Sequence, residues 1–596
     1  MLKKLKKINM LLDHTQRVRM VFLVILMLIS AFLETLGIAL IVPIMSVIVD
    51  PVSISQNKYH MGDLYNALHF SSTTDFAVFM MIGLVLVFVV KNIILFLSNK
   101  AQLKFIYTNQ FDTSNRMMIN FMMRPYEYYL GADTSVIQRN ITSDINNVYA
   151  LILILLQLLS EIIVFIGLVA VLLVADAKMT MTIAAILILV LVIIRYVIKP
   201  IMLKAGKDNQ NYYSGLYKWI NQAVTGIKEI KVANKESYFI NEYAKCGEGY
   251  VRAVQKYNLY NSSPRLLIET VCIASLVFYM MFEMLGGETQ LSEMISQVSV
   301  LAAAAARLLP SANRINNYTT SIAYLEPFLD NVSDNLQQEI HDKNISYRAE
   351  DYKKKVTVEK LPVKKAIEMK NITYRYPNTD TLIFDDANVT FPVGRSIGIV
   401  GTSGAGKTTI IDICLGLLHP EKGVVLADGV DIQTNYRGWL RNIGYIPQTI
   451  FMLDGSIRKN VAFGVPDEDI DDEKVWNALR EAQLDEHVRS LPDGLGTEIG
   501  ERGIRLSGGQ RQRIGIARAL YEDPEVLVLD EATSALDGET EAAIMDSINR
   551  LHGRKTLIII AHRLTTIAGC DMIFRVKDGK VVRDDGAVQN VKGRAQ

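Results

Sequence analysis

The chain has little cysteine, little charge for its length and no excess of charge of either sign. Its four cysteines, Cys246, Cys272, Cys414 and Cys570, are widely separated and lack the spacing of metal ligands. We therefore expect free thiols in reducing surroundings, and neither a disulfide framework nor a metal centre built from them. Because the formal net charge is only +1, the charge balance gives no indication of a nucleic acid as partner.

The low share of charged residues is matched by a high share of apolar ones. Charged residues make up 21% and apolar residues 50% of the 596 residues, and the mean hydropathy is +0.19. This balance is unusual for a soluble protein and predicts membrane-spanning segments. The length also exceeds what one hydrophobic core supports, so we expect two or more domains.

Six apolar runs are long enough to cross a bilayer, which takes about 20 residues. The first follows a basic stretch over residues 1–19, is much longer than the apolar part of a signal peptide and lacks an evident cleavage site. We therefore interpret it as the first span. The six runs cover residues 20–49, 76–97, 148–174, 179–198, 266–285 and 294–312.

The basic residues of the connections predict the orientation of these spans. The connections at 50–75, 175–178 and 286–293 hold almost no Lys or Arg, whereas those at 98–147 and 199–264 are rich in both. By the positive-inside rule, both termini lie in the cytoplasm. The two basic connections are too long for turns, so we expect them to extend the membrane helices into the cytoplasm, where another part of the protein docks against them.

A short amphipathic helix is predicted within the 50–75 connection. Met61, Leu64, Tyr65 and Leu68 recur at helical spacing beside polar residues. From the pattern alone, this helix either lies at the outer membrane interface or packs on neighbouring loops.

The periodicity changes after a charged, proline-containing stretch at 326–365, which we interpret as a linker. Beyond it, short β-branched runs at 396–400, 525–529 and 556–560 alternate with helical stretches such as 541–551. This alternation predicts an α/β unit with a largely parallel sheet. The predicted domains are a helical membrane domain over 1–325, the linker over 326–365 and a cytoplasmic α/β domain over 366–596.

A phosphate-binding loop follows the first of these runs. The motif Gly401-x4-Gly406-Lys407-Thr408 stands between a predicted strand and a predicted helix, which is the context that such a loop requires. Its glycines let backbone amides approach phosphates, Lys407 reaches the β- and γ-phosphates, and Thr408 is placed to bind Mg²⁺. The expected ATP contacts are Tyr376, whose ring would stack on adenine, and Gly401, Thr402, Ser403, Gly404, Ala405, Gly406, Lys407, Thr408 and Thr409.

Two carboxylates follow the strand predicted at 525–529. Asp530 and Glu531 emerge at the carboxyl edge of the sheet, where ligands bind in parallel sheets. Asp530 suits the Mg²⁺ shell, and Glu531 is placed to polarise the attacking water as a general base. His562 follows the run at 556–560 and is a candidate contact for the γ-phosphate, although a lone histidine after a strand is more often structural.

A second phosphate cradle lies at Leu506–Gln510. Its serine and two glycines leave backbone N–H groups bare at a predicted helix start, and the serine hydroxyl adds a donor. One globular unit seldom needs two cradles for one triphosphate, so we expect the two to face each other across a two-fold interface between two chains. The candidate ATP contacts of this second cradle are Ser507, Gly508, Gly509 and Gln510.

These motifs, taken in order, resemble an ABC-transporter ATPase domain. The matching set comprises the loop at 401–408, Gln448 in Tyr445-Ile446-Pro447-Gln448, the cradle at 506–510, Asp530-Glu531, Ser534-Ala535-Leu536-Asp537 and His562. With the spans first and the ATPase second, the whole chain is similar to an ABC exporter half-transporter: six α-helical transmembrane spans followed by a cytoplasmic α/β P-loop ATPase domain.

The resemblance implies ATP hydrolysis with Mg²⁺ at two composite sites of a homodimer. It assigns catalysis to Glu531, His562 and Gln448, the metal to Thr408, Gln448 and Asp530, and a nucleotide contact to Asp537. Gln448 would also sense the cytoplasmic membrane helices, and residues 497–503 resemble an exporter loop that contacts those helices.

Charged residues in the spans need a reason, because each costs about 2.5–3.5 kcal/mol on insertion scales. Arg307 and Arg314 share a face of the sixth helix, since seven residues make nearly two turns. With Lys91 and Arg265, on the cytoplasmic side, they could line a site for an anionic head group. Alternatively, Lys91 and Arg265 snorkel to the interface, or the cations pair within the membrane. The acids available for such pairing are Glu34, Glu161 and Glu269.

The membrane half also bears a narrower resemblance. Residues 308–315, Ser263-Pro264-Arg265 and the helix-like outer loop are similar to bacterial flippases of lipid-linked oligosaccharides. This implies an anionic polyprenyl-pyrophosphate glycan as substrate, membrane lipids as further partners and the bacterial inner membrane as location. Guanidinium groups bind pyrophosphate bidentately, which is consistent with the arginines.

Three other functions remain open from the sequence. Within transporters, the chain could export a peptide, a drug or another lipid, although an apolar drug has no need of the arginines. Some ABC ATPases are soluble mechanical proteins that act on DNA or ribosomes, which the spans argue against. A channel or regulator gated by ATP is disfavoured because the chain keeps Glu531 as the candidate base and His562 as the candidate γ-phosphate contact.

Overall fold

The computed structural model describes most of the chain, in two compact units. The described residues are 2–40, 44, 61–70, 72–175, 177–286, 291–337, 346, 348–353, 358–531, 538–561, 566–567 and 569–584. One unit comprises Met1–Arg124 with Ala132–Lys354, and the other comprises Pro125–Gly131 with Lys355–Gln596. We call them the helical unit and the ATPase unit and describe each by itself.

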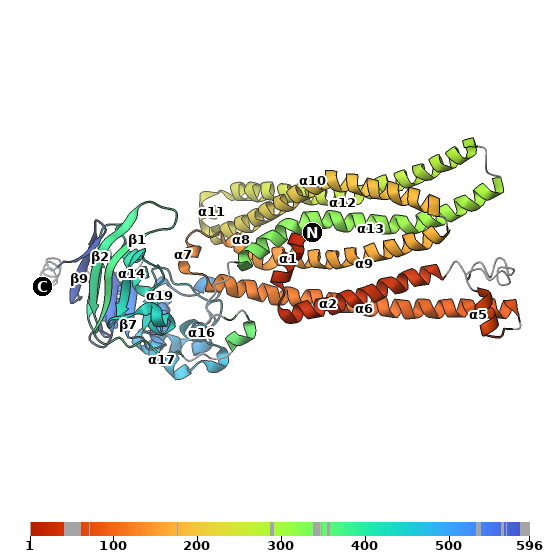
Figure 1. Ribbon diagram of the computed structural model, residues 1–596. Helices are drawn as coiled ribbons and strands as arrows, with labels where there is room; N and C mark the ends of the chain where they lie inside the picture. Colours follow the sequence, from red (N-terminus) through yellow and green to blue (C-terminus); the bar gives the residue numbers. More distant parts are fainter. Residues whose placement is uncertain are drawn as a thin grey trace. The chain divides into compact units, whose positions relative to one another are not determined.

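The helical unit is built from long helices (Figure 1). Three stretches of the described chain are long and apolar enough to cross a membrane, His14–Gly37, Thr73–Met123 and Thr134–Ala170. The other predicted spans fall on α10, α12 and α13, where the backbone is described but many side chains are not, so the number six stays a prediction. The elements are α1 Leu2–Leu11, α2 His14–Ala39, α5 Met61–Ala67, α6 Thr73–Met123, α8 Thr134–Arg139, the π-helical turn η2 Asn140–Asp144, α9 Ile145–Ala175, α10 Ala177–Thr225, α11 Ile227–Ala233, α12 Glu236–Gly286, α13 Leu291–Gln337 and the 3₁₀ turn η3 Ala349–Lys353.

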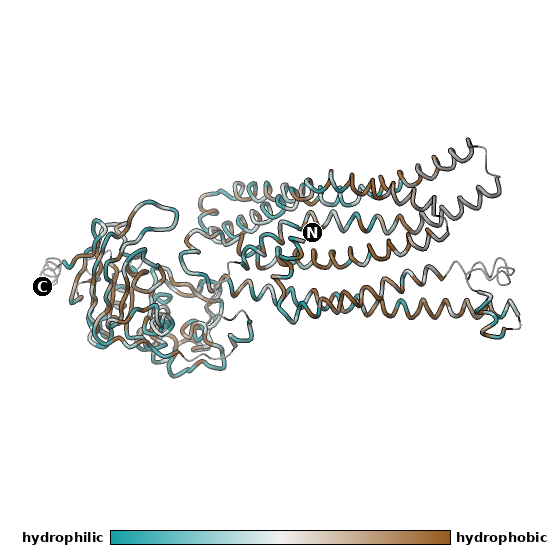
Figure 2. Tube along the Cα trace, viewed as in Figure 1, coloured by the Kyte–Doolittle hydropathy of each residue, from teal (hydrophilic) through white to brown (hydrophobic). Residues whose placement is uncertain are grey.

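The long helices extend far beyond a bilayer, as the sequence predicts. α6 has 51 residues, which corresponds to about 75 Å against a hydrocarbon core of about 30 Å. Figure 2 shows apolar residues along α2, α6 and α9 and more hydrophilic ones in the part of α6 that leads to Met123. α13 includes Pro327 and continues to Gln337, so helix covers the first part of the predicted linker.

Small residues allow α10 and α13 to pack closely. A Cβ atom built on Gly206 of α10 would lie 2.1 Å from the carbonyl oxygen of Tyr324 on α13. The ring of Tyr324 stacks on Tyr257 of α12, with centroids 4.2 Å apart. Glycine at 206 therefore sets the distance between the two backbones.

A buried polar cluster joins η2 to its neighbouring helices. Arg139 contacts Asp144 at 3.1 Å and donates to Ser214 of α10 at 2.6 Å, while Asn331 of α13 donates to Asp144 at 2.6 Å. Because Arg139, Asp144 and Ser214 are buried and Asn331 is partly buried, we infer that the cluster fixes the register of α8, α10 and α13.

Ion pairs attach the N-terminal helix α1 to α13. Lys4 pairs with Glu326 at 2.7 Å, and Lys7 pairs with Asp330 at 2.9 Å. The short helix α5 confirms the helix predicted from Met61 to Leu68, and its Tyr65 packs edge-on against Phe76 of α6 at 5.3 Å.

The ATPase unit contains two sheets (Figure 1). In the six-stranded sheet the order is β10-β9-β3-β8-β7-β6, and all pairs are parallel except β9–β10, which confirms the predicted parallel sheet. The second sheet has the order β2-β1-β4-β5, is antiparallel and was not predicted from the sequence. Its strands alternate buried and exposed residues along β1 and β2, as expected for a sheet with one solvated face.

The strands and helices of the ATPase unit have the following bounds. The strands are β1 Ala366–Arg375, β2 Leu382–Pro392, β3 Ser396–Val400, β4 Lys422–Ala427, β5 Val430–Asp431, β6 Ile443–Ile446, β7 Val526–Asp530, β8 Thr556–Ile560, β9 Met572–Lys577 and β10 Lys580–Arg583. The helices are α7 Tyr126–Tyr129, α14 Lys407–Leu415, α15 Tyr436–Leu440, α16 Ile457–Val461, α17 Asp472–Glu481, α18 Asp485–Ser490, α19 Gly508–Leu520 and α20 Gly538–Asn549, with 3₁₀ turns η4 Ile432–Asn435, η5 Asp467–Asp469, η6 Gly494–Gly496 and η7 Glu501–Gly503.

Candidate functional site

The phosphate-binding loop lies between β3 and α14, as predicted. All five residues of β3 are buried, so the loop starts from a fixed strand end. The Lys407 ammonium donates to the carbonyl oxygens of Gly401 and Thr402 at 3.1 and 3.2 Å, and the lysine is almost fully buried. The loop therefore holds its cation over its own backbone, where a phosphate cradled by the amides would meet it.

Gly406 is required by the turn into α14. Its φ is +99°, and an added Cβ would lie 2.9 Å from Ile383 and 3.0 Å from Phe384. This backbone conformation strains any side chain and leaves no room for one. The glycine thus lets β2 pack directly beneath the loop.

Tyr376 is positioned from the antiparallel sheet. Its hydroxyl lies 2.9 Å from the hydroxyl of Thr409 on α14, and its ring meets Tyr374 edge-on with centroids 5.3 Å apart. These contacts fix the ring beside the phosphate loop. The expected stacking on adenine stays a prediction.

The carboxylates of β7 lie at the same sheet edge as the loop, because β3, β8 and β7 are adjacent and parallel. Asp530 ends β7, and only 8% of it is exposed. Glu531 has φ +48°, a left-handed conformation that non-glycine residues adopt rarely. The Gln448 amide donates to the Glu531 carboxylate at 3.0 Å, so the structure brings together two of the three predicted catalytic residues.

A third carboxylate, not predicted from the sequence, lies near Asp530 at this edge. Asp412 of α14 is partly buried, and burial together with the nearby Asp530 charge raises its pKa to about 6. Burial and the neighbouring Glu531 also raise the pKa of Asp530. The available signal was a single acid within the apolar run Ile410, Ile411, Ile413 and Cys414.

The donor groups at this sheet edge fit Mg²⁺. Among the described residues no group of three His, Cys, Asp or Glu side chains is arranged as a metal site, but Mg²⁺ is usually held by one or two carboxylates together with phosphate oxygens and waters. Asp530 supplies the carboxylate, Thr408 a hydroxyl and Gln448 an amide oxygen. A cation here would offset the clustered negative charge that raises the two pKa values.

Neutralising Asp412 is expected to stabilise the ATPase unit at neutral pH. Its raised pKa means that the charged form is disfavoured in the folded state, so the penalty is absent below the ordinary pKa of 3.8 and complete above about pH 6. After allowance for solvent screening, we expect Asp412→Asn to add about 1–2 kcal/mol at pH 7.5. Thermal unfolding at pH 7.5 and near pH 4 tests this. Asp380→Asn, an exposed control, should change neither, and an equal gain at both pH values would contradict the assignment.

The second cradle caps a helix, as predicted. Ser507 is the N-cap of α19, and its hydroxyl accepts the backbone N–H of Gln510 at 3.2 Å, while the Gln510 side chain accepts the Ser507 N–H at 2.8 Å. Ser507 and Gly508 are exposed. Among the described residues, no hydrogen bond or ion pair joins this cradle to the phosphate loop of the same chain.

Two predicted nucleotide-site residues, His562 and Asp537, lie outside the described residues. β8 ends at Ile560, at the sheet edge that carries the loop and Asp530. The roles of both residues stay predictions.

In the helical unit, the structure brings together two of the four predicted substrate residues. Arg265 of α12 and Arg314 of α13 line one pocket of about 470 Å³, with Glu269 and Asn313. Lys91 lies elsewhere, on α6, with its ammonium 4.6 Å from the Phe88 ring. Arg307 falls in α13, but its side chain lies outside the described residues.

Arg314 has an acidic partner in this unit. Its guanidinium donates two hydrogen bonds to Glu161 of α9, at 2.7 and 3.0 Å, and Ser311 donates to the same carboxylate. Its side chain is nevertheless 48% exposed. Pairing within the membrane domain, the alternative left open by the sequence, is thus present for Arg314.

Two segments of the chain match known protein families. Residues 20–300 match the family described as ABC transporter transmembrane region, and residues 384–534 match the family described as ABC transporter. An uncharacterized ABC transporter ATP-binding protein, y4gM, of Sinorhizobium fredii is 41% identical over 229 residues, covering 38% of each chain. The heterocyst differentiation ATP-binding protein HepA of Nostoc sp. is 31% identical over 360 residues, covering 60% of this chain and 57% of that protein. The chain therefore matches less than two thirds of the length of these relatives.

A solved structure extends the match to nearly the full length. A bacterial Atm1-family ABC exporter with ATP bound superposes with a TM-score of 0.74 at 20% identity, covering 98% of this chain and 97% of that one. At this identity the likeness establishes the fold. With the membrane family matched first and the ATPase family second, the two matched regions place this chain among the ABC transporters, and it has the fold of an ABC exporter.

Proposed function

We propose that this chain hydrolyses ATP as one half of a homodimer and uses the energy to flip a lipid-linked oligosaccharide. The cargo would be a glycan on polyprenyl pyrophosphate, moved from the cytoplasmic to the outer leaflet of a bacterial inner membrane. The observation that carries the cargo assignment is the pocket lined by Arg265 and Arg314. The nucleotide motifs and their geometry support the ATPase.

The nucleotide chemistry follows from the sheet edge. The loop amides and Lys407 hold the triphosphate, and Thr408, Asp530 and Gln448 would hold Mg²⁺, which neutralises phosphate charge when bound. Glu531, oriented by Gln448, takes the proton of the attacking water. Ser507 of the partner chain would complete the site from the opposite side, so ATP binding closes the dimer and hydrolysis reopens it.

A short segment between the membrane helices supports coupling. Residues Pro125–Gly131, which include α7, belong to the ATPase unit. The Glu127 carboxylate accepts the backbone N–H of His419 at 2.6 Å and lies 2.9 Å from its ring Nδ1. His419 follows α14 by four residues, so this contact connects the phosphate-loop helix to a segment that continues into α6 and α8.

The pocket of Arg265 and Arg314 suits the head group of this cargo. Guanidinium groups bind phosphate oxygens bidentately and keep their charge at any physiological pH. Asn313 also lines the pocket, and its buried side-chain oxygen has no hydrogen-bond partner among the described residues. The pocket therefore offers cationic donors for phosphate oxygens, together with an acceptor that suits a hydroxyl group of the glycan and not the phosphate.

The Arg314–Glu161 pair favours a second candidate function. A bidentate carboxylate already occupies one guanidinium edge, which lowers the net positive charge that a pyrophosphate would meet. An exporter of a neutral lipid, drug or peptide would retain such a pair for helix packing. The ATPase mechanism is the same in both cases.

Transport of a lipid-pyrophosphate glycan in proteoliposomes decides between them. We expect Arg307→Ala and Arg265→Gln to reduce flipping at least about tenfold, because each removes a charge-assisted contact worth about 1.5–3 kcal/mol. Arg252→Gln removes an exposed cation from the same helix as Arg265 and should leave flipping unchanged. If the folded arginine variants flip the glycan as fast as the wild type, the anionic cargo is wrong.

A further inference from the structure

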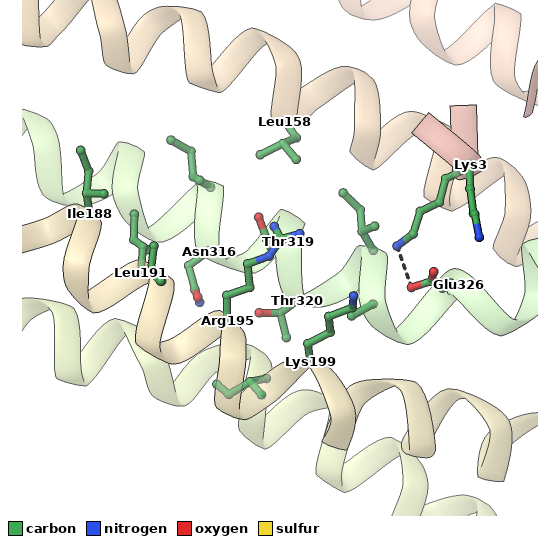
Figure 3. Close-up of a pocket in the computed structure, with 16 residues that line it drawn as sticks. Lys3, Leu158, Ile188, Leu191, Arg195, Lys199, Asn316, Thr319, Thr320 and Glu326 are labelled. Atoms are coloured by element: carbon green, nitrogen blue, oxygen red, sulfur yellow. Dashed lines mark ion pairs between the residues drawn. The ribbon is translucent and has the colours of Figure 1, made fainter. Parts of the chain in front are cut away.

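A second pocket in the helical unit lies apart from the arginine pocket just described. Its volume is about 380 Å³, and residues of α1, α9, α10 and α13 line it (Figure 3). The apolar lining comes mainly from Leu158, Ile188, Leu191, Val192 and Ile315. Ile188 and Val192 are more than half exposed on α10, so the pocket opens on the apolar outer surface of this helix.

Cations gather toward one end of this pocket. Arg195 and Lys199 of α10 line it together with Lys3 and Lys4 of α1, and Glu326 is the single acid among the lining residues. Glu326 is occupied by Lys4 at 2.7 Å. Among the described residues, no ion pair is present for Lys3, Arg195 or Lys199. The pocket thus carries a net positive charge that no ion pair with a described residue of the helical unit neutralises.

The lining of the pocket changes from apolar residues at one end to charged residues at the other. Figure 3 shows Ile188 and Leu191 toward one end, Arg195 extending into the middle, and Lys3, Lys199 and Glu326 toward the other end. Arg195 and Lys199 come at the end of the fourth predicted span, where the positive-inside rule places the cytoplasmic interface. The cationic end therefore coincides with the level of lipid head groups, and the apolar end with the acyl chains.

A buried donor without a partner points into the same pocket. Asn316 of α13 is 5% exposed and lines the pocket, and its side-chain Nδ2 has no hydrogen-bond partner among the described residues. Leaving such a donor unsatisfied costs about 1–3 kcal/mol. Snorkelling explains one exposed Arg or Lys at a time, but it does not explain a buried amide donor beside them.

We propose that this pocket binds the phosphate head group of an anionic phospholipid of the cytoplasmic leaflet, separately from the transported cargo. Arg195, Lys199 and Lys3 bind the phosphate, Asn316 donates to a phosphate or ester oxygen, and the apolar residues of α10 receive the start of an acyl chain. Free phosphate shares the head-group chemistry, but the apolar lining has no role with it. The Lys4–Glu326 pair closes the pocket by holding α1 on α13.

Native mass spectrometry of the purified full-length protein tests this, because it counts bound lipids without requiring transport. We expect the wild type to retain phosphatidylglycerol over phosphatidylcholine of the same acyl chains. Arg195→Gln combined with Lys199→Gln should reduce bound phosphatidylglycerol about tenfold or more. Asn316→Asp, nearly isosteric, places a carboxylate against the phosphate and should also reduce it. The matched control is Lys204→Gln, which removes an exposed cation five residues beyond Lys199 on α10 and should leave bound phosphatidylglycerol unchanged.

Three results would overturn the proposal. The first is equal retention of the two phospholipids by the wild type. The second is unchanged phosphatidylglycerol binding in both the double variant and Asn316→Asp. The third is a thermal shift from millimolar inorganic phosphate as large as that from phosphatidylglycerol, which would assign the pocket to the free ion. None of these readouts depends on the cargo, so their results neither support nor contradict the proposed flippase function.

Discussion

Glu531→Gln is expected to bind ATP normally and to lose at least about 100-fold in steady-state hydrolysis, the range of a general base. The substitution keeps the size of the side chain and its place after β7, and it keeps an oxygen that can accept from the Gln448 amide. It removes only the ability to take a proton from water. Phosphate release under saturating ATP, with binding of a fluorescent ATP analogue, separates these two effects.

Glu525→Gln provides the matched control. Glu525 is an exposed carboxylate at the amino end of the same strand, so its neutralisation changes the charge equally without touching the carboxyl edge. We expect wild-type hydrolysis from this variant. Hydrolysis by Glu531→Gln at the wild-type rate would remove Glu531 from the base position and leave the arrangement around Asp530 without a catalyst.

Gly206→Ala is expected to destabilise the helical unit by about 3 kcal/mol or more, the upper range for overpacking. The added Cβ would stand 2.1 Å from the Tyr324 carbonyl oxygen and 3.1 Å from its carbon. Both atoms belong to the α13 backbone, so no side chain can swing away. α10 and α13 must separate, which disturbs the Tyr257–Tyr324 stack as well.

The melting temperature of the purified protein and the fraction that elutes as a single species measure this effect. Gly83→Ala is the control, because Gly83 lies within α6 and a Cβ there meets nothing within 4 Å. Alanine at that position should be neutral or slightly stabilising, since glycine is the weaker helix former. Equal melting temperatures for the two variants would show that α10 and α13 do not rely on close backbone contact.

The sequence predicts the parallel part of the ATPase unit closely because its strands are buried on both faces. The runs at 396–400 and 556–560 have the bounds of β3 and β8, and the run at 525–529 precedes β7 by one residue. Continuous β-branched runs of this kind have few alternatives in a doubly covered sheet. The phosphate loop follows from the strand and helix that flank it, so its position is predicted as well.

Local sequence patterns do not predict contacts between residues that lie far apart in the chain. The Arg314–Glu161 pair joins residues 153 positions apart, and the sequence shows both charges without showing which cation the acid meets. Asp412 looks like one polar residue in a short helix until β7 places Asp530 beside it. The antiparallel sheet is harder to predict because register shifts interrupt the pairing of β1 with β2 and β4, and because β5 has only two residues.

The capping box at the start of α19 has a consequence for what the second cradle can bind. The Ser507 oxygen already accepts the Gln510 N–H, which directs one of its two lone pairs toward the helix. Its hydrogen is left to point outward, because a hydroxyl has one hydrogen to donate. Together with the amides at the start of α19, this hydroxyl hydrogen offers several donors to an anion, while the serine oxygen keeps one further lone pair. The cradle therefore selects the sign of a ligand's charge before its shape: it favours the binding of an anion and disfavours that of a cation.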